Sequence, residues 1–285
     1  MQWRGSRSSS NVDDRRSISG GGLAAGGGIT ALIVYLLYSF LSGGEIDPSQ
    51  IPQLSQPSEQ SAPMSEKAQA EDNDRAEFVK VVLAETEDVW NAKFAERGQQ
   101  YPEPKLVLFR GAVASACGNA SAASGPFYCP GDNQLYIDLS FYEDLQNKLN
   151  APGDFAMAYV VAHEVGHHIQ NVNGTAAKVN KMRSQMSEAE FNKISVKMEL
   201  QADFLAGVWA HYAQKTKGIL EPGDIEEALI AANAIGDDRL QKQATGQVTP
   251  DAFTHGTSAQ RMYWFKKGYQ TGDLSQGDTF NASDL

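Results

Sequence analysis

The chain has 285 residues and a formal net charge of −11 at pH 7. This acidic balance argues against binding to nucleic acid or to anionic lipid through charge, because both partners are themselves negative. The length is ample for one globular domain behind an N-terminal extension, and nothing in the sequence indicates an oligomeric state.

Residues 23–42 are predicted to form one transmembrane signal-anchor helix. They lie in the uncharged stretch Ser17–Gly44, and about 20 apolar residues suffice to cross a bilayer. Arginines precede this stretch and acidic residues follow it: Arg4, Arg7, Arg15 and Arg16, then Glu45 and Asp47. By the positive-inside rule, residues 1–22 form a short cytoplasmic tail and the later chain is exported, periplasmic or extracellular, on a single-pass inner-membrane anchor. The alternative is a cleaved signal peptide, but no Ala-x-Ala-like site follows the apolar core.

Residues 43–72 are predicted to be a linker. Prolines alternate with glutamines from Asp47 to Pro63, and such a stretch cannot bury a core. We therefore expect an extended tether that holds the domain, residues 73–285, away from the membrane.

The first part of this domain predicts a helix and two strands. Apolar residues recur at helical spacing over Asp74–Arg97. Lys105–Phe109 and Gln134–Leu139 are short runs rich in strand-forming residues, and each predicts a strand.

The chain contains two cysteines, Cys117 and Cys129. In an oxidising compartment they can form one disulfide, and otherwise they are two buried free thiols. Their spacing fits no zinc knuckle, so we do not expect them to bind metal.

The sequence His163-Glu164-Val165-Gly166-His167 follows an apolar stretch that predicts a helix beginning near Asp154. Residues i and i+4 of a helix are neighbours on one face, so His163 and His167 can bind one zinc ion. Glu164 then lies beside them, where it can take a proton from a metal-bound water. The alternative is a core helix with two hydrogen-bonded histidines.

The third metal ligand narrows the class of site. A histidine six residues past His167 would indicate a metzincin, but that position is Asn173. The inverted motif, with a carboxylate directly before the second histidine, is also absent. The remaining common solution is a glutamate on a second helix.

A second helix is predicted from Ser187, which forms a capping box with Glu190. Within it, Glu199 and Asp203 lie four residues apart on one face. We expect Glu199 to complete the zinc ligands and Asp203 to accept the free ring N–H of a ligand histidine. The alternative is an exposed acidic helix face.

Together these motifs resemble the bacterial family described as "Putative neutral zinc metallopeptidase". The resemblance rests on Ala162–Gln170 and Glu199–Asp203, and it covers roughly residues 75 to 270. Further similar segments are 115–118, 126–130, 234–238 and 255–261. The resemblance implies an α+β fold: a zincin-like (gluzincin) metallopeptidase domain with a small mixed sheet and active-site helices, preceded by one transmembrane helix. It also implies one zinc ion and a peptide or protein substrate.

The resemblance further implies where a substrate binds. In zincin folds the strand before the motif helix lies at the sheet edge above the metal, where a peptide can add to it. That strand here would be Leu135, Tyr136, Ile137, Asp138 and Leu139, unless it is an inner strand. By the same resemblance, His255 and Arg261 are candidate catalytic residues that donate to the substrate carbonyl, although Arg261 can instead pair with Asp237 or Asp238.

The sequence therefore predicts a membrane-anchored zinc peptidase in which Glu164 is the general base. The alternative is an exported, zinc-stabilised binding or chaperone-like module of the same fold without turnover. An intramembrane protease is disfavoured, because residues 171–197 are too polar for a membrane span. The sequence does not distinguish an endopeptidase from an exopeptidase.

Overall fold

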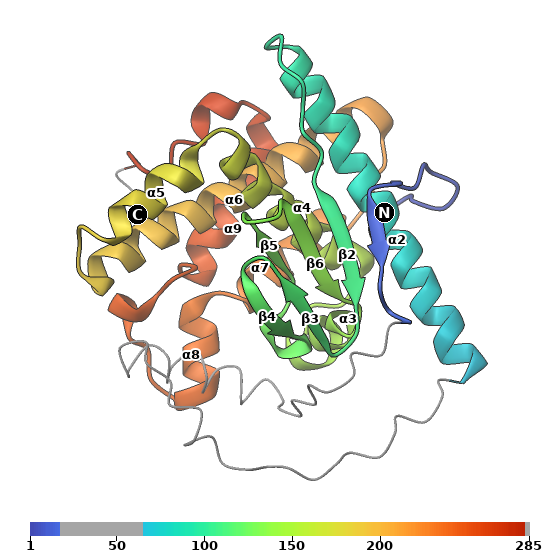
Figure 1. The fold of residues 1–285 in the computed structure, drawn as a ribbon, viewed down its shortest axis with the longest axis horizontal. Coiled ribbons are helices and arrows are strands. Elements are labelled where there is room, and N and C mark those ends of the chain that lie inside the picture. The colour runs from blue at the N-terminus through green and yellow to red at the C-terminus, as the bar shows by residue number, and fades with distance from the viewer. Residues whose placement is uncertain (18–64, 283–285) are drawn as a thin grey trace.

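The computed structural model describes residues 1–17 and 65–282 (Figure 1). The fold is α+β, with helices packed around two small sheets. The helices are α2 Glu66–Ala95, α3 Phe141–Glu143, α4 Asp154–Val172, α5 Thr175–Arg183, α6 Glu188–Lys217, α7 Asp224–Ala234, α8 Asp237–Thr245 and α9 Ser258–Thr271. The strands are β1 Val12–Asp14, β2 Lys105–Phe109, β3 Ala112–Ser115, β4 Gly118–Ser121, β5 Phe127–Cys129 and β6 Gln134–Asp138.

The larger sheet has the strand order β1-β2-β6-β5, in which only the pairing of β5 with β6 is antiparallel. Alternate residues of β2 face opposite sides of this sheet. Leu106 and Leu108 belong to the main helical core, whereas Val107 and Phe109 pack in a smaller cluster that also contains Val113 of β3. Because both faces of the sheet are covered at β2, the sequence of this strand is a nearly continuous apolar run and does not alternate between apolar and polar residues.

The substrate-strand prediction for residues 135–139 is corrected by this topology. Strand β6 pairs with β2 on one side and with β5 on the other, so it is an inner strand and Leu139 lies just beyond its end. The strand at this edge of the sheet is β5, which was not predicted. Its three residues are too short a run to give a recognisable alternation.

Helices α4 and α6 form the centre of the molecule. Helix α4 begins at Asp154 after Gly153, as predicted, and nearly all of its residues are buried. The predicted capping box begins α6, with Ser187 and Glu190 exchanging hydrogen bonds. The opening helix, α2, begins at Glu66, so the last part of the predicted linker is helical.

Residues 1–17, predicted as a tail apart from the domain, instead lie on it. Strand β1 pairs in parallel with β2, with Val12 opposite Leu106. The predicted transmembrane helix over 23–42 lies outside the described residues, as does most of the predicted linker. Within residues 1–17 and 65–282, no helix is long and apolar enough to cross a membrane.

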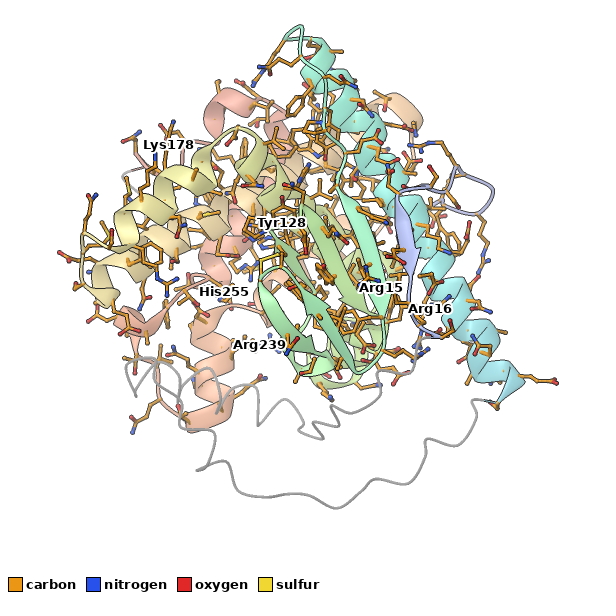
Figure 2. All side chains as sticks on the ribbon, in the orientation of Figure 1. Arg15, Arg16, Tyr128, Lys178, Arg239 and His255 are labelled. Carbon is orange, nitrogen blue, oxygen red and sulfur yellow. A yellow bond between two sulfur atoms is a disulfide. The ribbon has the colours of Figure 1, made fainter. Side chains whose placement is uncertain are left out.

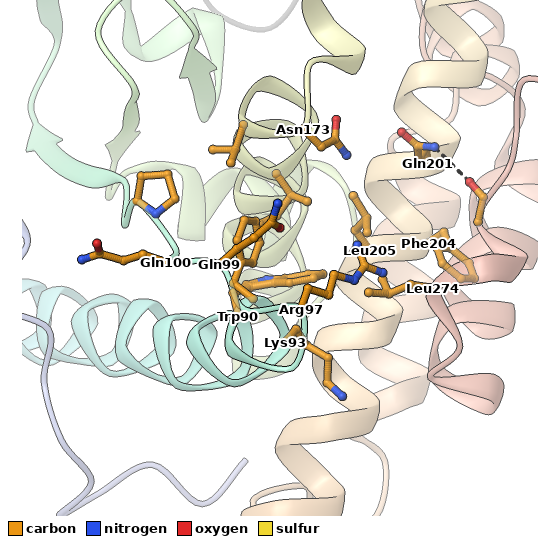
Figure 3. A pocket seen from close by; sticks show the side chains of 15 residues that line it. Trp90, Lys93, Arg97, Gln99, Gln100, Asn173, Gln201, Phe204, Leu205 and Leu274 are labelled. Atoms are coloured by element: carbon orange, nitrogen blue, oxygen red, sulfur yellow. Dashed lines mark hydrogen bonds between the residues drawn. The ribbon is translucent and has the colours of Figure 1, made fainter.

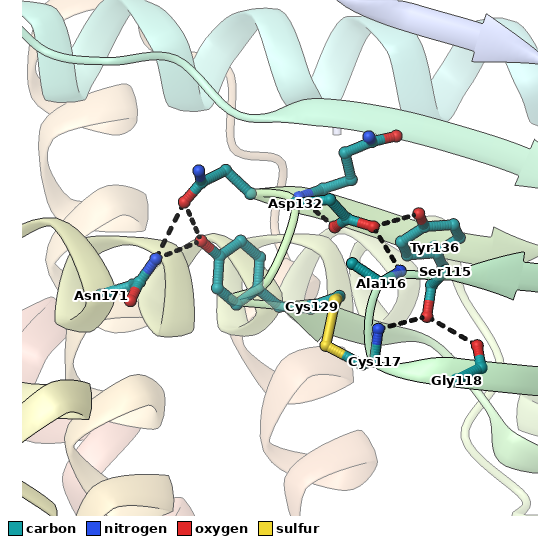
Figure 4. The surroundings of a disulfide bond; sticks show 11 residues. Ser115, Ala116, Cys117, Gly118, Cys129, Asp132, Tyr136 and Asn171 are labelled. Carbon is teal, nitrogen blue, oxygen red and sulfur yellow. Dashed lines mark hydrogen bonds between the residues drawn. A yellow bond between two sulfur atoms is a disulfide. The ribbon is translucent and has the colours of Figure 1, made fainter. Parts of the chain in front are cut away.

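The two cysteines form a disulfide (Figure 4). It joins Cys117, in the turn between β3 and β4, to Cys129 at the end of β5. Asp132 reinforces this connection, because its carboxylate accepts hydrogen bonds from the Ala116 N–H at 3.0 Å and the Tyr136 hydroxyl at 2.7 Å. The hairpin is thereby fixed to the edge of the main sheet.

Helices α6 and α9 approach each other through two glycines. A Cβ at Gly207 would lie 2.1 Å from the Phe265 carbonyl oxygen, and one at Gly268 would lie 2.1 Å from the Phe204 carbonyl oxygen. Both neighbours are helix backbone, which cannot move aside without separating the two helices. This position therefore requires glycine on both helices.

We predict that Gly207→Ala lowers the free energy of unfolding by about 1–3 kcal/mol or more, the usual cost of overpacking a core. Urea denaturation of the purified protein would measure it. Gln270→Ala, at an exposed position of α9, is the control and should change stability by less than about 0.5 kcal/mol. Equal stability of both variants and the wild type would contradict the packing described.

Candidate metal centre

Three predicted metal ligands meet between α4 and α6. The Nε2 atoms of His163 and His167 lie 3.1 Å apart, and the Glu199 Oε2 atom lies 3.1 Å from the first and 3.4 Å from the second. Zinc binds such donors at about 2.0–2.2 Å, and tetrahedral geometry then places them about 3.4 Å from one another. The donor set therefore fits a single zinc ion, with a fourth position left for water or substrate.

The close approach of the two helices explains how Glu199 reaches the histidines. A Cβ at Gly166 would lie 2.9 Å from the Ala202 carbonyl oxygen and 3.0 Å from the Ala202 Cα. Gly166 lies within the His163–His167 turn, and Ala202 lies one turn after Glu199. The helices thus touch beside all three ligands.

His163 is held by a buried charged network. Its Nδ1 lies 2.7 Å from the Asp203 Oδ1, which also accepts a hydrogen bond from the Tyr159 hydroxyl at 2.5 Å. Burial raises the pKa of Asp203, but Arg261 and His163 lower it more, to about 2. The predicted role of Asp203 thus has the required geometry, since its ionised carboxylate fixes the Nδ1–H tautomer and leaves Nε2 for the metal.

Arg261 lies behind His163, away from the metal donors. Its Nε donates to the Asp203 Oδ2 at 2.9 Å, and its Nη2 donates to the Asp203 Oδ1 at 3.0 Å. The residue is only 2% exposed. The predicted contact with a substrate carbonyl is therefore not what the structure shows, and neither is the alternative of pairing with Asp237 or Asp238. Arg261 positions Asp203.

His167 has a neutral support that sequence reasoning missed. Its Nδ1 lies 2.9 Å from the Oε1 of Gln170, and the Gln170 side-chain amide donates to the Met198 carbonyl at 2.7 Å and to the Gln201 Oε1 at 3.2 Å. Gln170 is fully buried. The available signal was its position three residues after His167, which places the two side chains on one helix face.

Glu164 and His255 complete the polar surroundings. Burial raises the pKa of Glu164, and the neighbouring His167 and His163 offset this only in part. His255 is about half exposed, and its Nδ1 lies 2.9 Å from the Thr254 hydroxyl and 3.4 Å from the Asp237 Oδ1. Dehydration lowers the pKa of His255, but the carboxylates of Glu199 and Asp237 raise it above its ordinary value.

The remaining histidines on α4 and α6, His168 and His211, make hydrogen bonds that stabilise the fold. His168 donates from Nε2 to the Pro102 carbonyl at 2.6 Å and accepts at Nδ1 from the Tyr128 hydroxyl. His211 donates from Nδ1 to the Tyr269 carbonyl at 2.8 Å.

Two other features of the described residues lie apart from the metal ligands. A cavity of about 710 Å³ lies among α2, α4 and α6 and is lined by Trp90, Phe94 and Phe204 among others, but by none of the metal ligands (Figure 3). Asp154, Asp224 and Glu227 form an acidic group whose oxygens lie within 4.8 Å of one another.

The fold brings two histidines and one glutamate together as possible metal ligands, with a second glutamate beside them on the same helix as the histidines. The sequence model of the family "Putative neutral zinc metallopeptidase" matches residues 1–280, so the chain belongs to this family. Zinc is the metal that the family's description names.

Curated relatives agree over long stretches. "Uncharacterized protein YpfJ" of Escherichia coli K12 is 48% identical and covers 99% of this chain and 100% of its own length. "Uncharacterized protein Rv2575" of Mycobacterium tuberculosis H37Rv is 47% identical over 65% of each chain. No solved structure is significantly similar to this chain.

We predict that Gln170→Ala weakens zinc binding by about 10–100-fold, as is typical when the support of a ligand histidine is removed. Competition with a chromogenic chelator would measure the affinity. Gln270→Ala, at an exposed position of α9, is the control and should leave the affinity unchanged. Wild-type affinity in Gln170→Ala would show that this hydrogen bond does not organise the site.

Proposed function

We propose that this protein is a zinc-dependent peptidase in which Glu164 is the general base. The observation that carries the proposal is the arrangement of His163, His167 and Glu199, whose donor atoms fit one zinc ion beside Glu164 on the same helix. A zinc site that serves only stability needs no such free carboxylate, and it usually has four protein ligands.

The chain's own residues account for the proton transfers. Zinc, when bound, would polarise a water molecule and the peptide carbonyl. Glu164 would accept the proton of that water and later deliver it to the leaving amine. The α+β architecture, with helices α4 and α6 beside a small mixed sheet, agrees with this chemistry.

Strand β5 is the best candidate to bind an extended substrate. One side of β5 pairs with β6, and within the described residues no backbone hydrogen bond occupies its other side. The Tyr128 hydroxyl fixes β5 to the motif helix through His168 and Asn171. A peptide that adds to this free edge would therefore lie close to the helix that carries the histidines.

His255 is the best candidate to stabilise negative charge on the carbonyl oxygen. Asp237 and Thr254 hold its Nδ1, and within the described residues its Nε2 makes no hydrogen bond. The carboxylates of Glu199 and Asp237 raise the pKa of His255 and so favour the imidazolium form, in which Nε2 carries a proton to donate.

The disulfide supports an exported domain. The Cys117–Cys129 disulfide joins the β3–β4 turn to the end of β5, and such bonds persist mainly in oxidising compartments. Peptides or proteins outside the cytoplasm are therefore the proposed substrates.

We predict that Glu164→Gln retains stoichiometric zinc but lowers kcat by about 10²–10⁴-fold, the usual contribution of a general base. Zinc content and cleavage of a peptide library would be measured on both proteins. Zinc in both without cleavage in either would favour the binding or chaperone-like module instead. Absence of zinc from the wild type would contradict the site.

We predict that His255→Ala lowers kcat by about 10²–10³-fold, as does loss of one donor to a developing oxyanion. Zinc affinity should change little, because His255 is not a ligand. His211→Ala is the matched control and should leave kcat unchanged. An unaltered kcat in His255→Ala would mean that another group supplies the donor.

A further inference from the structure

Residues 1–17 complete the hydrogen bonding of a buried carboxylate on α2. Glu87 is only 2% exposed. Within the described residues, every hydrogen bond to its carboxylate comes from the N-terminal segment: Arg7 at 2.9 Å, Ser9 at 2.5 Å and Asn11 at 2.9 Å. The segment therefore lies against the Glu87 carboxylate and supplies the hydrogen-bond partners that a buried charge requires.

A second buried carboxylate repeats the pattern. Asp72 is 4% exposed and pairs with Arg16 from the N-terminal segment and with Arg110 from the end of β2. Figure 2 shows Arg15 and Arg16 where β1 meets α2. Arg16 from the N-terminal segment and Arg110 from the rest of the domain therefore both compensate the negative charge of Asp72.

Backbone and apolar contacts extend the same attachment. Leu106 N–H donates to the Asn11 carbonyl and Arg15 N–H donates to the Leu108 carbonyl, both at 2.8 Å, so β1 occupies the outer edge of β2. The Trp3 ring packs edge-on against Phe78 with centroids 5.3 Å apart. The segment thus contributes both to the sheet and to the core.

The four arginines that indicated a cytoplasmic tail all have acidic partners in this arrangement. Arg4 pairs with Asp74, Arg7 with Glu87 and Asp88, Arg15 with Asp13, and Arg16 with Asp14 and Asp72. Three of these arginines therefore hold the segment to α2. The presence of these three arginines is explained by the docking of residues 1–17 on α2. It does not require the positive-inside rule as its explanation.

We propose that residues 1–17 and 65–282 lie on the same side of any membrane, because residues 1–17 dock on α2 and on the outer edge of β2. A chain that crossed a bilayer once between these parts would separate them by about 30 Å of hydrocarbon. Strand β1 could not then pair with β2. The proposal stands independently of the peptidase activity.

The first test is zero-length carbodiimide coupling of the full-length protein in its own membrane fraction. The Lys105 Nζ lies 3.8 Å from the Asp13 Oδ2, and the Lys80 Nζ lies 3.8 Å from the Asp14 Oδ2. We expect mass spectrometry to find one or both amide links. Lys93 in the last turn of α2 and Glu96 just after the helix, 2.7 Å apart, are the internal positive control. Asp13→Asn should abolish the Lys105 link alone, and the control link without either of the others would overturn the proposal.

The second test measures sidedness with single exposed cysteines, Ser10→Cys and Ser184→Cys. The native cysteines are bonded to each other and should not react. Intact cells would be treated with a membrane-impermeant maleimide, before and after permeabilisation. Labelling of both positions, or protection of both, in intact cells is the expected result. Labelling of one position with protection of the other would overturn the proposal.

Discussion

The contact between helices α4 and α6 at Gly166 and Ala202 is the constraint on which the site depends. Two histidines four residues apart follow from helix geometry alone, but the third ligand comes from a helix that begins more than twenty residues after the motif. Only a position without a side chain lets the Ala202 backbone approach closely enough for Glu199 to reach both Nε2 atoms. The glycines between α6 and α9 extend the same principle, because α9 carries Arg261 towards Asp203.

The two ligand histidines have unlike supports, and this difference is chemically meaningful. His163 faces an ionised carboxylate that Arg261 and Tyr159 hold in place, whereas His167 faces the neutral amide of Gln170. A carboxylate makes its imidazole a stronger electron donor than an amide does. Both supports fix the tautomer that leaves Nε2 free, but they add only one negative charge to a site that already contains Glu164 and Glu199.

Much of the site could be predicted from the sequence, because its parts are local. His163, Glu164 and His167 lie within one helical turn or so, and Glu199 and Asp203 share one face of a capped helix. The failures concern contacts between distant segments. Arg261 reaches Asp203 and not a substrate, β5 and not Leu135–Leu139 forms the sheet edge, and residues 1–17 join the domain. Sequence patterns such as an apolar run, an excess of arginines or a strand-like alternation do not reveal which distant residue a side chain contacts in the folded protein.

The most direct test of the account is anomalous diffraction at the zinc edge from crystals of the zinc-loaded protein. We expect one strong peak about 2.0–2.2 Å from the Nε2 atoms of His163 and His167 and from the Glu199 carboxylate. A peak at the acidic group of Asp154, Asp224 and Glu227, or one that lacks Glu199 as a ligand, would contradict it.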